Sequence, residues 1–127
     1  MVITFDIVGY EAFDEFMANF SGNHKLVHIF FTASKCPNGK SWSEECNKVT
    51  QIIKDVSEHC DPESFIINVQ VGDQLAWRDP DNPFKKDPRT NLQEIPTILR
   101  WKLNYKLQGD RCLESNNLKK MLTGDEI

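Results

Sequence analysis

The chain has 127 residues, a length that predicts a single domain spanning residues 1–127. Its 15 Lys and Arg residues against 19 Asp and Glu residues give a net charge of −4. Because both signs are scattered along the sequence, neither nucleic acid nor a membrane is expected as a partner.

The first elements follow from hydrophobic periodicity. Residues 3–8 predict a short strand that closes at Gly9. A helix is predicted next, because its apolar side chains recur at helical spacing: Phe13, Phe16, Met17 and Phe20. Residues 26–32 then form a continuous apolar run rich in β-branched and aromatic side chains, which is typical of a central strand covered on both faces.

The middle of the chain predicts a second helix and a third strand. From Ser43 to about His59 the apolar side chains again follow one helical stripe: Cys46, Val49, Ile52, Ile53 and Val56. Residues 65–71 predict the next strand. The polar stretch 72–91 comes after it, and connections of this length are usually functional or carry short helices of their own.

The end of the chain predicts a hairpin and a last helix. Residues 97–101 and 105–107 form the hairpin, turning at 102–104, and Ser115 caps a helix with an apolar side made of Leu118, Met121 and Leu122. The whole order implies parallel pairing in the first half and an antiparallel edge in the second. We therefore predict an α/β fold in which helices sandwich a mixed sheet of four or five strands.

Residues 42–46 read Trp-Ser-Glu-Glu-Cys and lie where the predicted central strand leads into a helix. A Cys-x-x-Cys at such a turn is the signature of thiol–disulfide exchange. Here Cys46 provides the second cysteine, whereas Ser43 occupies the first position. The function of the protein therefore depends on whether the Ser43 hydroxyl can replace a cysteine thiol in thiol–disulfide exchange.

The cysteines are irregularly spaced: Cys36, Cys46, Cys60 and Cys112. Residues 1–6 lack the basic start and the apolar run of a signal peptide, so we expect a cytoplasmic protein with reduced thiols. The cysteine and histidine spacings match no metal-ligand pattern, and no metal is expected.

Several short segments match those of a known family, occur in the same order, and together cover most of the chain. They are 31–35 (Phe-Thr-Ala-Ser-Lys), 39–42 (Gly-Lys-Ser-Trp), Cys46, 70–72 (Gln-Val-Gly), 77–80 (Trp-Arg-Asp-Pro) with Asn82 and Phe84, and 95–97 (Ile-Pro-Thr). Together they resemble the thioredoxin superfamily and, more narrowly, the thioredoxin domain-containing protein 17 family. The nine-residue bridge from Ser34 to Trp42 is similar to the longer active-site loop of that family.

The resemblance implies a thioredoxin-like domain and a protein-disulfide reductase with a Trp-Cys-Pro-Asp-Cys site. No cofactor is bound in such a protein, and electrons come from NADPH through thioredoxin reductase. The first cysteine attacks the client disulfide and the second resolves the mixed disulfide. Trp42 and Cys46 carry over, with Cys46 at the resolving position, whereas Ser43 stands at the nucleophile position.

The family's cis-proline maps onto Pro96. The resemblance therefore implies that client peptides bind between Trp42 and the segment made of Ile95, Pro96 and Thr97. Backbone hydrogen bonds would hold an extended peptide there, as in β-augmentation.

Ser43 argues against dithiol chemistry. Exchange requires a thiolate, and a serine hydroxyl stays protonated at neutral pH unless a base removes its proton. Glu44 and Glu45 suit the start of a helix, but beside a thiol they would disfavour a negatively charged sulfur. His28 could accept a proton, but we interpret it as a hydrogen-bonded core histidine.

Three further points concern the roles of Cys46, Cys36 and the segment 34–41. Cys46 is interpreted as a buried, inert thiol rather than a reactive one. Cys36 is a possible substitute thiol, since the loop that carries it could bring it to Cys46. Residues 34–41 also resemble half of a P-loop, but Ser34 replaces the first glycine and Pro37 removes an amide from the nest that would cradle an anion.

We therefore predict a monomeric protein that binds protein or peptide clients on a thioredoxin-like scaffold and is defective in dithiol–disulfide exchange. The alternative is a residual disulfide oxidoreductase or peroxidase activity through Cys46, alone or with Cys36. Thioredoxin reductase would be a partner only in that alternative.

Overall fold

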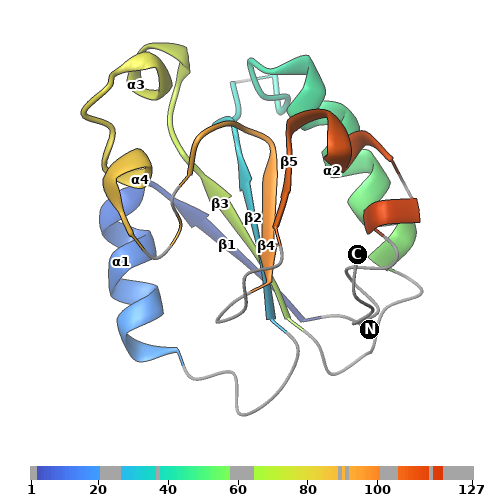
Figure 1. The fold of residues 1–127 in the computed structure, drawn as a ribbon, viewed down its shortest axis with the longest axis horizontal. Helices are drawn as coiled ribbons and strands as arrows, with labels where there is room; N and C mark the ends of the chain where they lie inside the picture. Colours follow the sequence, from blue (N-terminus) through green and yellow to red (C-terminus); the bar gives the residue numbers. More distant parts are fainter. Residues whose placement is uncertain are drawn as a thin grey trace.

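The computed structural model describes residues 3–20, 27–36, 38–57, 65–88, 90, 92–100, 106–114 and 116–118. The strands in Figure 1 are β1 (Ile3–Val8), β2 (Val27–Thr32), β3 (Phe65–Gln70), β4 (Thr97–Arg100) and β5 (Lys106–Gln108). The helices are α1 (Tyr10–Asn19), α2 (Glu44–Ser57), α3 (Gln74–Arg78), α4 (Pro83–Lys86) and the 3-10 helix η2 (Gly109–Leu113). Among the described residues, no helix combines the length and apolarity that crossing a bilayer requires.

The strands form one mixed sheet in the order β1-β3-β2-β4-β5. Strand β3 pairs in parallel with β1 and β2, and β4 pairs antiparallel with β2 and β5. The predicted α/β sandwich, its parallel first half and its antiparallel edge are therefore confirmed. Every residue of β2 is buried, as the continuous apolar run predicted for a strand covered on both faces.

Alternate side chains of β2 enter two separate apolar cores, because successive residues of a strand point to opposite faces of the sheet. Ile29 and Phe31 pack with residues of α1 in one core, and Phe30 packs with residues of α2 in the other. Figure 1 shows the same division: α1, α3 and α4 lie on one side of the sheet, and α2 and η2 lie on the other.

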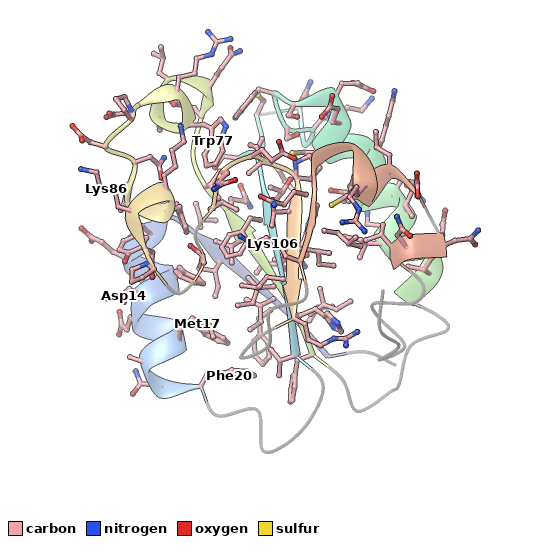
Figure 2. The ribbon with its side chains drawn as sticks, viewed as in Figure 1. Asp14, Met17, Phe20, Trp77, Lys86 and Lys106 are labelled. Atoms are coloured by element: carbon pink, nitrogen blue, oxygen red, sulfur yellow. The ribbon has the colours of Figure 1, made fainter. Side chains whose placement is uncertain are left out.

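The polar stretch 72–91 contains the two short helices α3 and α4, in line with the expectation for a connection of this length. Asp73 caps α3 by accepting a hydrogen bond from the amide of Ala76 at 2.8 Å, and Asn82 caps α4 through the amide of Phe84 at 2.9 Å. Phe84 is buried against the aromatic rings of α1 and β2. The segment is thus anchored on the α1 side, and Trp77 of α3, labelled in Figure 2, packs against the same core.

The end of the chain differs from the prediction in one respect. The sequence patterns did not indicate η2, which follows β5 directly at Gly109 and carries the buried Cys112. Residues 116–118 are helical, and Leu118 is buried as predicted. The predicted turn at 102–104, the capping residue Ser115, and Met121 and Leu122 lie outside the described residues.

Candidate functional site

Three chain segments meet at one edge of the sheet. Strands β2 and β3 are parallel and end side by side, where the amide of Val71 donates to the carbonyl of Thr32 at 3.0 Å. Strand β4 is antiparallel to β2 and begins at that edge, because Thr97 lies opposite Phe31. The loop before α2, the loop before α3 and the segment before β4 therefore converge, as the upper edge of Figure 1 shows.

Trp42 is held in place by Gly72. Its indole Nε1 donates to the carbonyl of Gly72 at 3.0 Å, and the ring is half-buried. Gly72 is also tied to Ser34, whose amide donates to the same carbonyl at 3.1 Å and whose hydroxyl accepts from the Gly72 amide at 2.9 Å. The φ angle of Gly72 is +124°, and a Cβ there would lie 2.9 Å from the Cβ of Ala76, so only glycine fits.

Ser43 is the N-cap of α2. Its hydroxyl oxygen accepts a hydrogen bond from the amide of Cys46 at 3.3 Å, and its carbonyl accepts the first helical bond, from Asn47 at 3.1 Å. This is the usual task of a serine before a helix, since the first amides of a helix have no partner within it. Among the described residues, no histidine or carboxylate forms a hydrogen bond with the Ser43 hydroxyl.

Ser41 and Asn47 form a second layer of hydrogen bonds behind Ser43. The Asn47 side-chain oxygen accepts from the amide and the hydroxyl of Ser41, both at 2.9 Å, and its amide nitrogen donates to the Ser41 carbonyl at 3.1 Å. The Ser41 hydroxyl in turn accepts from the amide of Ser43 at 3.3 Å. These bonds fix the backbone that leads into α2.

Cys46 lies one turn inside α2 and faces the core. It is fully buried, and its sulfur accepts a hydrogen bond from the amide of Ala33 at 3.4 Å. A thiol in this position is part of the packing between α2 and the end of β2. Solvent reaches the sulfur only if the start of the helix moves.

Cys36 is placed differently. It lies on a small hairpin in which Lys35 pairs with Ser41, and its own amide donates to the carbonyl of Lys40 at 2.8 Å. The side chain is exposed, and neither Cys36 nor Cys46 forms a disulfide. The structure thus gives an accessible thiol at Cys36 and an enclosed one at Cys46.

Pro96 follows a cis peptide bond from Ile95 and is buried. Its carbonyl accepts a hydrogen bond from the amide of Gly109 at 2.8 Å, and the Cys112 thiol lies 3.6 Å from the same oxygen. Cys112 also donates to the carbonyl of Leu107 at 3.2 Å, and burial raises the pKa of its thiol to about 12. Cys112 therefore acts as a protonated donor that supports the Pro96 segment.

Ile95 and Thr97 are not equivalent. Thr97 is fully buried in the sheet, and its hydroxyl donates to the carbonyl of Glu94 at 2.6 Å. Ile95 is half-buried, and its amide and carbonyl have no hydrogen-bond partner among the described residues. Within the predicted binding segment 95–97, Ile95 is the residue whose amide and carbonyl both remain unbonded to the described residues.

His28 is the core histidine that the sequence predicted. It is buried, and its Nε2 accepts a hydrogen bond from Nε of Arg100 at 3.3 Å. Ala33, beside which Cys46 lies, is five positions after His28 along the chain, and an extended strand covers about 17 Å over five residue steps. His28 is therefore too remote to serve as a base at the start of α2.

The structure gives a part in this site to residues that the sequence analysis placed only in motifs or among the cysteines (Ser34, Ser41, Gly72 and Cys112), and to Asn47, which it did not name. A glycine just after a predicted strand was a signal for Gly72. The bonds made by the others join segments far apart in the sequence, or depend on the exact conformation of the hairpin, and no local pattern reveals them.

Comparisons with known proteins identify the family and the fold. Residues 6–124 match the family described as "Thioredoxin domain-containing protein 17-like, thioredoxin domain". The chain is 30% identical over 119 residues to thioredoxin domain-containing protein 17 of Homo sapiens, covering 94% of each protein. It is 32% identical over 117 residues to the protein of the same name from Danio rerio, covering 92% of each.

Among solved structures, thioredoxin O1 from Arabidopsis thaliana superposes with a TM-score of 0.59 over 94% of this chain and 97% of that chain, at 16% identity. Chloroplastic thioredoxin z superposes with a TM-score of 0.57 at 17% identity, over 96% of this chain and 94% of that chain. At these identities the likeness establishes the fold alone. The chain has the thioredoxin fold, and it belongs to the thioredoxin domain-containing protein 17-like family.

Proposed function

We propose that this protein binds protein or peptide clients on a thioredoxin scaffold and has lost dithiol–disulfide exchange. In this proposal Ser43 stands where the family carries the attacking cysteine. We also propose that the protein is cytoplasmic and monomeric and that it does not depend on thioredoxin reductase.

The observation that carries the proposal is the role of the Ser43 hydroxyl as a helix cap. The oxygen accepts the Cys46 amide at 3.3 Å, and no base among the described residues is hydrogen-bonded to it. A serine in this environment stays protonated at neutral pH. Even an ionised oxygen would form no disulfide with a client, so Cys46 would have nothing to resolve.

The burial of Cys46 supports the same proposal. Thiol exchange requires the attacking sulfur to approach a client sulfur directly, and access therefore limits the reaction. Cys46 is fully buried, with the Ala33 amide on its sulfur. It suits a packing role in α2 better than attack on a large substrate.

The binding surface that we propose centres on Trp42 and Ile95. Trp42 supplies a half-buried aromatic ring fixed by Gly72, and Ile95 supplies backbone groups that can pair with an extended peptide. Leu75 on α3, 81% exposed, adds apolar surface three residues beyond Gly72. Exposed apolar side chains and accessible aromatic rings are both typical of peptide-binding surfaces.

Reduction of insulin disulfides with NADPH and thioredoxin reductase tests the loss of chemistry. The unmodified protein is expected to show background rates, and Ser43→Cys is expected to raise the rate by orders of magnitude, because it restores an attacking sulfur three residues before Cys46. Ser43→Ala is the matched control and should stay at background. Rapid turnover by the unmodified protein would refute the proposal.

A pull-down with Trp42→Ala and Cys46→Ser tests the binding role. The amount of client retained should fall with Trp42→Ala, because that change removes the aromatic ring of the proposed surface. It should not change with Cys46→Ser, because non-covalent binding at that surface does not require the Cys46 thiol. Loss of clients with Cys46→Ser alone would instead indicate a thiol-dependent contact.

A residual thiol activity remains the second candidate, and the exposure of Cys36 is the observation that favours it. An accessible thiolate could attack a disulfide or a peroxide without any movement of the fold. Cys36→Ser distinguishes this candidate, because any slow turnover of the unmodified protein should then disappear while Cys46→Ser leaves it unchanged.

A further inference from the structure

We propose that a positively charged groove between α2 and the hairpin at residues 35–41 binds an acidic segment of a partner protein. The groove is a cavity of about 480 Å³ lined by the hairpin, by α2 and by Thr32 and Ala33 at the end of β2. Its lining includes four lysines: Lys35, Lys40, Lys48 and Lys54. We call it the lysine groove. It is separate from the Trp42–Ile95 surface and does not rest on the proposed function.

The charge of the lysine groove is opposite to that of the whole protein. The chain has a net charge of −4, yet the groove contains one carboxylate, Glu44, against the four ammonium groups. Lys35, Lys40 and Lys48 are exposed and form no ion pair with the described residues. Lysines gathered from two elements into one concavity attract an anionic ligand.

The backbone of the hairpin shows that the ligand is not held as in a P-loop. The amide of Gly39 donates to the carbonyl of Cys36, the amide of Lys40 to the side chain of Asn38, and the amide of Ser41 to the side chain of Asn47. Because these amides already have acceptors, they form no nest for a phosphate. The Gly-Lys-Ser sequence at residues 39–41 therefore contributes a side-chain charge rather than a phosphate cradle.

The lining also contains no aromatic side chain on which a nucleotide base could stack. Recognition would therefore rely on the ammonium groups, which are mobile point charges suited to single carboxylates. These properties favour a chain of Asp and Glu residues over a nucleotide.

The length of the lysine groove fits an extended peptide. From Glu44 to Lys54 the helix rises by about 15 Å, which matches about four or five residues of extended chain. A second cavity of about 370 Å³ continues from the first, and the two share Lys35, Lys54 and the threonines Thr32 and Thr50. A ligand that meets lysines along this length needs several separated negative charges, as an acidic segment has.

Fluorescence anisotropy with a labelled oligo-glutamate peptide tests the proposal. At low ionic strength the peptide should bind saturably, an oligo-glutamine peptide should not, and added salt should weaken the binding because exposed charges are screened. On the unmodified protein, amide chemical-shift changes should fall on both walls of the groove, at Lys40 and Ser41 on the hairpin and at Gln51 on α2.

Charge reversal provides the matched variants. Lys48→Glu should raise the dissociation constant by about fivefold or more, because it replaces an attraction with a repulsion inside the groove. Arg111→Glu changes the net charge equally at an exposed residue that lines neither cavity, and it should change the constant by less than about twofold.

Absence of saturable oligo-glutamate binding at low ionic strength would overturn the proposal. An equal change in the dissociation constant for Lys48→Glu and Arg111→Glu would also overturn the proposal. It would show that binding depends only on the net charge of the protein. Pyrophosphate binding tighter than that of the peptide would assign the groove to small phosphate ligands and would also overturn it. None of these outcomes bears on the insulin assay, so the two proposals fail independently.

Discussion

The backbone amide of Cys46 donates to the hydroxyl of Ser43 across the first turn of α2, at 3.3 Å. This single contact joins the two residues on which the proposed function depends. It uses the Ser43 oxygen as a hydrogen-bond acceptor for the helix, while the Cys46 sulfur is enclosed behind it. The start of α2 is therefore built as a stable helix end.

The capping role of Ser43 predicts a loss of stability when the oxygen is removed. Ser43→Ala should lower the free energy of unfolding by about 1 kcal/mol, because the Cys46 amide then loses its acceptor. Ser43→Asn should stay within a few tenths of a kcal/mol, since its side chain also accepts at an N-cap. Urea denaturation of both variants measures the difference, and equal losses would contradict the assignment of Ser43 as the cap.

The accessibility of the thiols predicts which cysteines react. Iodoacetamide should modify Cys36 in the folded protein and leave Cys46 and Cys112 intact, because only Cys36 is exposed among these three. Peptide-resolved mass spectrometry reads each site separately, and labelling in urea provides the control in which all three react. Modification of Cys46 under native conditions at a rate similar to that of Cys36 would show that the start of α2 opens readily.

The Cys112 thiol predicts a loss of stability in alkaline solution. Its pKa is raised by burial from 9.0 to about 12. A raised pKa contributes stability that is complete below the unfolded value and is lost as the pH rises toward the folded value. Between about pH 8 and about pH 10 this group should reduce the free energy of unfolding by about 1 kcal/mol.

Cys112→Ala provides the comparison for that measurement, because alanine cannot titrate. The variant is less stable at every pH, since it leaves a cavity beneath Pro96. Its stability should nevertheless fall by less than that of the unmodified protein between the same two pH values. Parallel pH profiles under reducing conditions would show that Cys112 ionises as easily in the folded state as in the unfolded one.

Gly72 predicts a steric penalty that a matched glycine lacks. Gly39 and Gly72 both have positive φ angles, but a Cβ at Gly39 meets nothing within 4 Å, whereas at Gly72 it lies 2.9 Å from Ala76. Gly39→Ala should cost about 1 kcal/mol from backbone conformation alone. Gly72→Ala should cost about 3 kcal/mol, because it adds a clash within the loop that holds Trp42.

Thermal or chemical unfolding of the two glycine variants measures the contrast. In a protein of this size, each kcal/mol corresponds to a shift of a few degrees in the midpoint. A Gly72→Ala variant as stable as Gly39→Ala would show that α3 moves freely to admit the methyl group.

Much of the fold was predictable because its signals are local. The apolar run at 26–32 predicted the central strand, and the apolar stripe from Cys46 to Val56 predicted α2. The 3-10 helix η2 was missed, since its residues carry no apolar periodicity of their own and it is stabilised by contacts with Pro96 and Leu107.

The sequence by itself determined the family, the order of the elements and the presence of an oxygen at position 43. Only the tertiary structure decided that Cys46 is enclosed, that Cys36 is accessible, that Gly72 holds Trp42, and that lysines from a hairpin and a helix share one groove. The physical reason is the range of the forces involved. Periodicity and capping act between residues a few positions apart, whereas burial and hydrogen bonds between loops arise only after distant segments pack together.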